Sequence, residues 1–282
     1  MRKSSIFLFL FVTLSIIACD HKDVLEDIQI ENLDRCNGIS QNDSINKDTV
    51  DNDSHLQNDS INKDTVGNDS NQNIPCYVND KPYKGCKVSL MGNSRCTYRG
   101  YIPSINRTYY PRYDINNVKL TWWWKVIEIM EASLEVNESY SAGRVSNRHP
   151  SYPSYIDRVG NLGNPDVIFF WGGINDQRNK TPLGVLDFEK SIDELDESCF
   201  ASALDKLIRL MMKLYPKAKV IIFIEDALND KGYIGVLKEV ASHYNLKTVD
   251  LTELVTTRCQ GLHYDTHGMQ QIVDETVKQL GL

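Results

Sequence analysis

The feature that most constrains this fold is an alternation of short apolar runs with longer helical patterns from residue 76 onward. Five apolar runs have β-type composition and occur at 88–91, 134–136, 167–171, 220–224 and 247–251. Helical patterns lie between and after them, at 121–132, 198–214, 231–244 and 269–280. Strands that alternate with helices form βαβ units with parallel strand pairs. We therefore expect an α/β fold, a three-layer α/β/α sandwich around a parallel five-stranded sheet, over residues 76–282.

The first 19 residues have the composition of an export signal. Arg2 and Lys3 precede an almost unbroken apolar run at 6–17, which is short for a membrane-spanning helix. The run ends in Ile-Ile-Ala-Cys19, which resembles the lipobox of bacterial lipoproteins. This resemblance implies lipidation of Cys19 and a tether to a bacterial membrane, expected to be the periplasmic or surface face of the outer membrane. An ordinary cleaved signal peptide with an incidental cysteine is the alternative.

Residues 20–75 contain an internal repeat. The decapeptide Q-N-D-S-I-N-K-D-T-V occurs at 41–50 and again at 57–66. The segment has no aromatic residue and little apolar surface, so burial cannot offset the entropy of ordering it. It also lacks the glycine and glutamate spacing of an EF-hand calcium loop. We expect a disordered, acidic tether here.

Charge is distributed unevenly between the tether and the rest of the chain. Residues 20–75 hold 13 acidic and 4 basic side chains, whereas the whole chain has a net charge of −7. The part from residue 76 onward is therefore close to neutral. Because it shows no basic stripe, we do not expect a nucleic-acid partner.

The seven cysteines are difficult to assign from sequence. Cys76 and Cys86 flank a short segment with the pattern of a hairpin, and an exported protein permits a disulfide between them. The remaining cysteines beyond Cys19 allow too many pairings. No Cys/His spacing typical of zinc occurs, and we expect neither a metal nor a cofactor.

Candidate chemistry lies in polar segments that follow an expected strand or precede an expected helix. These segments are residues 92–94 (G-N-S), 137–144 (N-E-S-Y-S-A-G-R), 171–176 (W-G-G-I-N-D) and 261–269 (G-L-H-Y-D-T-H-G-M). Ligands of open α/β sheets bind at the carboxyl ends of the strands. The first apolar run stops abruptly at Gly92, so Ser94 is a candidate nucleophile at that edge. Each segment taken alone would equally suit an ordinary turn.

Taken together and in this order, the segments resemble the blocks of the SGNH, or GDSL-type, hydrolase family. Gly173-Ile174-Asn175-Asp176 matches the G-x-N-D block, and Gln260 to His263 has the spacing of the D-x-x-H block. The resemblance covers about residues 87–280 and implies a flavodoxin-like sandwich. Residues 100–103, 109–111 and the Trp122-Trp123-Trp124 helix start also look like a subgroup of lipoproteins from gut-type Bacteroidetes.

The resemblance also implies roles for individual residues. Ser94 would be the nucleophile and His263 its base, because a serine hydroxyl needs an adjacent proton acceptor. The oxyanion donors would be the Ser94 N–H, a backbone N–H at Ala142 or Gly143, and the Asn175 amide. His267 is an alternative base, but His263 has the family spacing.

The chain departs from the family pattern at three positions. Asn93 replaces the aspartate beside the nucleophile, where it can still make hydrogen bonds. Ala142 replaces a glycine, which we expect to be tolerable only if its φ is negative. Gln260 replaces the acid that orients the histidine, and an amide cannot carry the charge. The site is then either a Ser–His dyad or one in which another acid, such as Asp265, substitutes.

These features favour a lipid-anchored serine esterase that hydrolyses small acyl esters, such as acetyl groups, on a carbohydrate. The main alternative is a glycan-binding surface lipoprotein of the same fold with impaired catalysis. An adhesive or structural lipoprotein would explain the tether but not the ordered segments. Three adjacent tryptophans cannot all face one side of a helix, so one or two should enter the core. A sugar-stacking platform is their functional alternative.

Overall fold

A parallel five-stranded sheet forms the centre of the computed structural model, which describes residues 82–147 and 153–282. The strands are in the order β2-β1-β3-β4-β5, and all neighbouring pairs are parallel. Their bounds are β1 (Lys87–Met91), β2 (Ser133–Asn137), β3 (Val167–Trp171), β4 (Lys219–Ile224) and β5 (Lys247–Asp250). The expected α/β fold class and its five-stranded parallel sheet are confirmed.

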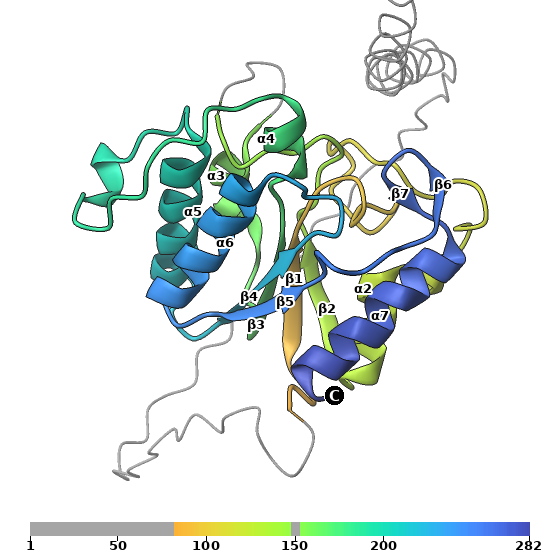
Figure 1. Cartoon of the computed structure of the whole chain (residues 1–282). Coiled ribbons are helices and arrows are strands. Elements are labelled where there is room, and N and C mark those ends of the chain that lie inside the picture. Colours follow the sequence, from red (N-terminus) through yellow and green to blue (C-terminus); the bar gives the residue numbers. More distant parts are fainter. Residues whose placement is uncertain (1–81, 148–152) are drawn as a thin grey trace, which may run out of the picture. The chain divides into compact units, whose positions relative to one another are not determined.

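Helices cover both faces of the sheet, as Figure 1 shows. One face carries α2 (Trp122–Ile129) and α7 (Thr266–Leu280), which pack against each other. The other carries α5 (Phe200–Leu214), α6 (Lys231–His243) and the short α3 (Tyr155–Arg158). The observed helices begin or end up to three residues from the expected bounds. α7 begins earlier than expected because the Asp265 side chain accepts a hydrogen bond from the Gly268 N–H and caps it.

The central strand β3 explains why the sheet needs two helical layers. All five of its residues, Val-Ile-Phe-Phe-Trp, are buried. Side chains alternate across a strand, so Phe169 and Trp171 pack on the α2/α7 side and Ile168 and Phe170 on the α5/α6 side. A strand buried on both faces reads as a continuous apolar run, which is the pattern seen in the sequence.

The three tryptophans at the start of α2 belong mainly to the core. Trp122 and Trp123 are fully buried, and the Trp122 ring lies 4.6 Å from that of Trp171 between ring centroids. Trp124 is half-buried and makes an edge contact with Tyr101. Two of the three rings therefore serve packing, and neither is accessible for stacking on a sugar.

Several short elements have too little periodicity to be visible in the sequence. They include α4 (Ile174–Arg178), β6 (Arg258–Gln260), β7 (His263–Tyr264) and the 3₁₀ turns η1 (Val118–Leu120), η2 (Val159–Asn161) and η3 (Ile192–Glu194). α4 follows directly after the β3 edge, and β6 and β7 form an antiparallel ribbon before α7. α4, β6 and β7 carry three residues of the candidate site, Asn175, Gln260 and His263.

The expected export signal, the tether and the lipidation site Cys19 lie outside the described residues. So does Cys76, and its pairing with Cys86 stays a prediction. Within residues 82–147 and 153–282, no helix combines the length and apolar character needed to cross a membrane.

Candidate active site

Ser94 and His263 lie in direct contact although 169 residues separate them. Ser94 follows β1 in a tight turn and is half-buried. His263 begins β7 and is 8% exposed. The distance from His263 Nε2 to Ser94 Oγ is 2.8 Å, which is a hydrogen bond between a hydroxyl and a proton acceptor.

Aromatic rings enclose His263. The Tyr109 ring stacks on the imidazole at 3.4 Å between ring centroids with an angle of 8°, and Tyr110 approaches edge-on. Burial and the positive charges of Arg95, Arg112 and Arg178 hold the pKa of His263 well below its ordinary value. The imidazole is therefore neutral at neutral pH, the form that accepts a proton.

The third partner of His263 is a backbone carbonyl. A backbone hydrogen bond at Gln260 raises the pKa of His263 against the larger effect of burial, which points to the Gln260 carbonyl, because an acceptor favours the charged ring. Because Nε2 faces Ser94, Nδ1 is the ring nitrogen left to donate to it. The Gln260 side chain points elsewhere, and its Oε1 accepts hydrogen bonds from the hydroxyls of Tyr109 and Tyr113 at 3.2 and 2.7 Å.

The alternatives considered for the base and the acid lie in other settings. Asp265 caps the N-terminus of α7 through the Gly268 N–H at 2.7 Å. His267 is exposed in the first turn of α7. Of the two candidate bases, it is His263 that the structure places against Ser94, with the Gln260 carbonyl behind it.

The turn at Ala142 corrects one expectation. Ala142 has φ of +65°, in the left-handed region, so our requirement for a negative φ was wrong. A non-glycine residue in this region costs on the order of 1 kcal/mol, which the surrounding structure must offset. The Gly143 N–H donates to the Tyr140 carbonyl at 2.8 Å and is not available to a ligand. The Ala142 N–H makes no hydrogen bond within the described residues.

Asn175 lies beside this turn. It is the second residue of α4, and its Nδ2 donates to the Gly143 carbonyl at 2.9 Å. An amide carries two hydrogens, so the other can reach a substrate oxygen. The chain can turn from β3 into α4 because Gly173, with φ of +114°, caps the helix.

Asp176 fixes the far end of the same loop. It is fully buried, and its carboxylate accepts hydrogen bonds from the backbone N–H groups of Val145 and Ser146 at 2.9 and 3.0 Å. The Ser146 hydroxyl adds a third at 2.6 Å. Asn175 and Asp176 therefore hold the same loop. Asn175 contacts it at Gly143, and Asp176 contacts it at Val145 and Ser146.

Glu225 is a residue of this site that the sequence analysis missed. It directly follows β4, is fully buried, and accepts hydrogen bonds from the Asn93 amide at 3.0 and 3.1 Å. A signal for it was present, because the apolar run at 220–224 ends in the charged pair Glu225-Asp226. A charged residue at the carboxyl edge of a strand is a reason to look for a site.

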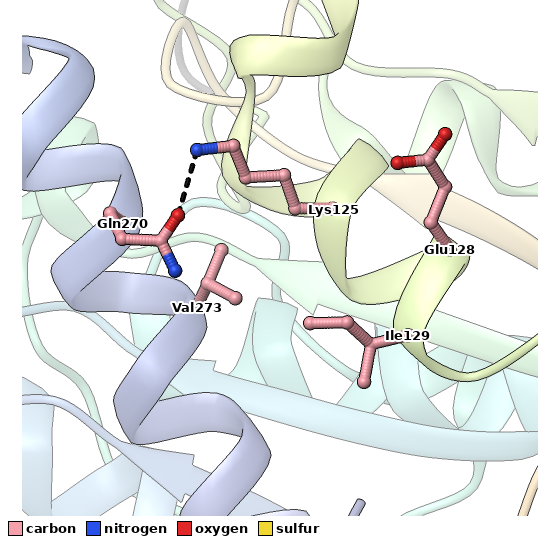
Figure 2. A pocket seen from close by; sticks show the side chains of 5 residues that line it. All are labelled: Lys125, Glu128, Ile129, Gln270 and Val273. Carbon is pink, nitrogen blue, oxygen red and sulfur yellow. Dashed lines mark hydrogen bonds between the residues drawn. The ribbon is translucent and has the colours of Figure 1, made fainter.

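A groove of about 320 Å³ lies apart from these residues, on the helical surface between α2 and α7. Figure 2 shows its lining, where the Lys125 ammonium donates to the Gln270 amide oxygen at 2.8 Å. Glu128, Ile129 and Val273 complete it. None of the candidate catalytic residues lines this groove, so it is separate from the Ser94–His263 pair.

The family becomes clear from comparison with known proteins. The family model described as GDSL-like lipase/acylhydrolase matches residues 86–280, which include the whole sheet and both members of the pair. This chain belongs to the GDSL-like lipase/acylhydrolase family. A search of curated proteins found no match.

Two solved structures of GDSL-like proteins agree with this assignment, and a third structure shares the fold alone. A GDSL-like lipase from Bacteroides ovatus is 28% identical, with a TM-score of 0.64, over 70% of this chain and 99% of that one. One from Bacteroides uniformis is 27% identical, with a TM-score of 0.63, over 70% and 96%. A protein from Lactobacillus plantarum, 14% identical with a TM-score of 0.54 over 70% and 97%, shares the fold.

Proposed function

We propose that this GDSL-like hydrolase is a serine esterase in which Ser94 is the nucleophile and His263 the base. The observation that carries the proposal is the 2.8 Å contact between Ser94 Oγ and His263 Nε2. Two backbone N–H groups, of Ser94 and Ala142, make no hydrogen bond within the described residues. Activated hydroxyl and free donors are the two requirements of acyl transfer.

The reaction follows from these positions. His263 Nε2 takes the proton of Ser94 as Oγ bonds to the ester carbonyl carbon, and the carbonyl oxygen becomes an oxyanion. The N–H groups of Ser94 and Ala142 and the Asn175 amide donate to that oxyanion. The C–O bond to the alcohol then breaks, and His263 returns the proton to the leaving oxygen. Water repeats the sequence on the acyl-enzyme and releases the acid and free Ser94.

The Gln260 carbonyl takes the orienting part of a triad acid in this scheme. It holds the His263 ring in place and accepts from the ring nitrogen opposite Ser94, which selects the tautomer with a free Nε2. A neutral carbonyl stabilises the transient imidazolium less than a carboxylate does. The proposed enzyme is thus a Ser–His dyad with a carbonyl behind it.

The proposed substrates are esters of small acyl groups, acetyl included, on a carbohydrate. Tyr113 and Tyr101 are 58% and 38% exposed, and large exposed rings offer faces on which sugars stack. Tyr113 is fixed close to the base, since its hydroxyl donates to Gln260, three residues before His263.

Cys19 is the proposed lipid anchor, which would place the hydrolase on a bacterial membrane, with the outer membrane as its site. Its support is the lipobox-like sequence I-I-A-C. Growth of an expressing bacterium with labelled palmitate should label the wild-type chain and leave Cys19→Ser unlabelled. Equal labelling of the two would exclude Cys19 as the acylated residue.

The catalytic proposal is tested with purified protein and two acetyl esters, p-nitrophenyl acetate and an acetylated xylo-oligosaccharide. Wild type should turn over at least one, and Ser94→Ala should lose at least about 10⁴-fold in kcat. A fluorophosphonate probe should label wild type and not Ser94→Ala. Equal hydrolysis by the two proteins would rule out Ser94 as the nucleophile.

A glycan-binding protein without catalysis is the second candidate, and the neutral partner of His263 favours it. It predicts that wild type binds the oligosaccharide without turnover or probe labelling. It also predicts that Ser94→Ala binds the oligosaccharide equally well.

A further inference from the structure

Glu225 lies behind the nucleophile turn at the carboxyl edge of β4. Its side chain is 0% exposed. A buried carboxylate loses its hydration, which costs several kcal/mol unless charges and hydrogen bonds replace the water. Burial accordingly raises the pKa of Glu225, and the nearby charge of Arg95 opposes that effect. The position is therefore expensive in free energy and needs a dedicated set of partners.

Those partners come from both sides of Ser94. The Asn93 amide donates to both carboxylate oxygens, and Arg95 Nη1 donates at 2.6 Å. Asn93 Oδ1 in turn accepts from the Arg95 N–H at 3.0 Å, across the nucleophile. The residues immediately before and after Ser94 are thus held by one carboxylate and by each other.

The same network reaches the rest of the site. The N–H of Ile174, the residue before Asn175, approaches Glu225 Oε1 at 3.4 Å. Arg95 Nε donates to the carbonyl of Leu262, the residue before His263, at 3.0 Å. Glu225 therefore connects the nucleophile turn with α4 directly, and with the base through Arg95.

The charges of this network are compatible with asparagine at position 93 and not with aspartate. Arg95 is 1% exposed and lies 3.5 Å from Asp226 as well as beside Glu225. Burial by itself lowers the pKa of Arg95, but Tyr264 and the two carboxylates raise it above its ordinary value, so it stays charged. An aspartate at 93 would add a third carboxylate about 3 Å from Glu225, and like charges that close cannot both ionise.

We propose that Glu225 is a positioning residue for the esterase reaction, and that the pair of Asn93 and Glu225 replaces the family's aspartate in setting the Ser94 turn. The inference rests on the proposed function, because the position of Ser94 matters only if Ser94 reacts. Glu225 does not touch the substrate. It acts by fixing the backbone at Asn93, Arg95 and Ile174.

The experiment exchanges the amide at position 93 and the carboxylate at position 225. Variants Asn93→Asp, Glu225→Gln and the double variant are compared for kcat and KM on p-nitrophenyl acetate, well below their melting temperatures. Asn93→Asp should lower kcat at least about tenfold with KM nearly unchanged, because two carboxylates then face each other. Glu225→Gln should also lower kcat, since Arg95 loses its closest counter-charge.

The double variant should recover kcat to within about threefold of wild type, because it re-forms a carboxylate–amide hydrogen bond with the two groups exchanged. Glu239→Gln, the same change at an exposed position on α6, should leave kcat unaltered. A double variant no faster than the slower single variant would overturn the proposal. So would an Asn93→Asp variant as active as wild type.

Unfolding in urea separates this inference from the proposed function. It is measured on wild type, the two single variants at positions 93 and 225, and the double variant. The pairing predicts that the changes in the free energy of unfolding are not additive. The double variant should lose less stability than the sum of the losses in the two single variants. Additive stabilities would overturn the pairing even if the protein is an esterase. If the stabilities are non-additive but wild type shows no turnover and no fluorophosphonate labelling, the pairing stands. The esterase, and with it the positioning role, is then refuted. If a single variant does not fold, the kcat of the double variant still tests the pairing. Recovery to within about threefold of wild type supports it, and a larger loss overturns it.

Discussion

The two halves of the Ser94–His263 pair are held by different means. On the nucleophile side, two fully buried carboxylates do the holding, Glu225 at the Ser94 turn and Asp176 at the loop that follows Ala142. On the base side, His263 has a stacked tyrosine ring and the carbonyl of Gln260. Among the described residues, no carboxylate takes the position of a triad acid.

The difference shows where negative charge is useful in this site. Beside the nucleophile, the carboxylates accept from backbone N–H groups and from Arg95, so they fix the turns without facing the reacting oxygen. At the base, the ring stack orients the imidazole, and burial together with nearby arginine charges keeps it neutral before reaction. We expect the nucleophile side to be sensitive to single side-chain changes and the base side to tolerate changes that spare the backbone.

The largest of the remaining effects is expected on the nucleophile side, at Asn175. Asn175→Ala removes a proposed oxyanion donor and should lower kcat by about 10²–10³-fold, with a smaller change in KM. Steady-state kinetics on p-nitrophenyl acetate measure this. Gln270→Ala removes the same amide from the distant groove and should have no effect. If kcat of Asn175→Ala falls by less than about threefold, Asn175 is not an oxyanion donor.

On the base side, Gln260→Ala should cost little. The variant keeps the backbone carbonyl and loses only the contacts with Tyr109 and Tyr113, so kcat should fall less than about tenfold, against about 10⁴-fold when a triad acid is neutralised. Tyr113→Phe is the matched variant, since it removes one of the same hydrogen bonds. A thousandfold loss at Gln260 would mean that its side chain, and not its carbonyl, supports His263.

The smallest expected effect is on pH dependence. Protonated His263 cannot accept the Ser94 proton, so activity falls as pH drops through its pKa. Because that pKa is well below its ordinary value, kcat/KM should stay level at pH 6.5 and fall only in more acidic buffer. Arg112→Gln removes one of the charges that depress the pKa, so its acidic limb should move to higher pH.

Arg112→Lys keeps the charge and should resemble wild type in the same pH profile. The difference between the two variants should shrink at high salt, because Arg112 is partly exposed and its charge is screened. An acidic limb that stays in place in Arg112→Gln would show that the charge of Arg112 does not lower the pKa of His263.

Much of the architecture was predictable because it depends on local patterns. The run at 167–171 coincides with β3, and the other four runs lie within one residue of their strands. The elements without periodicity were not predictable, and α4, β6 and β7 are among them. Asp265 looked like a substitute acid because it is close in sequence to His263, yet its carboxylate is committed to the α7 cap.

The sequence by itself determined the α/β order of the chain and the candidate residues Ser94, Asn175 and His263, because these depend on residue type and spacing. Only the tertiary structure decided that Gln260 contributes a carbonyl, that Ala142 occupies the left-handed region, and that Glu225 faces Asn93. Each of these depends on the meeting of groups far apart in the chain, or on a backbone angle that neighbouring loops impose. Neither a long-range contact nor such a backbone angle can be predicted from the identity of a side chain alone.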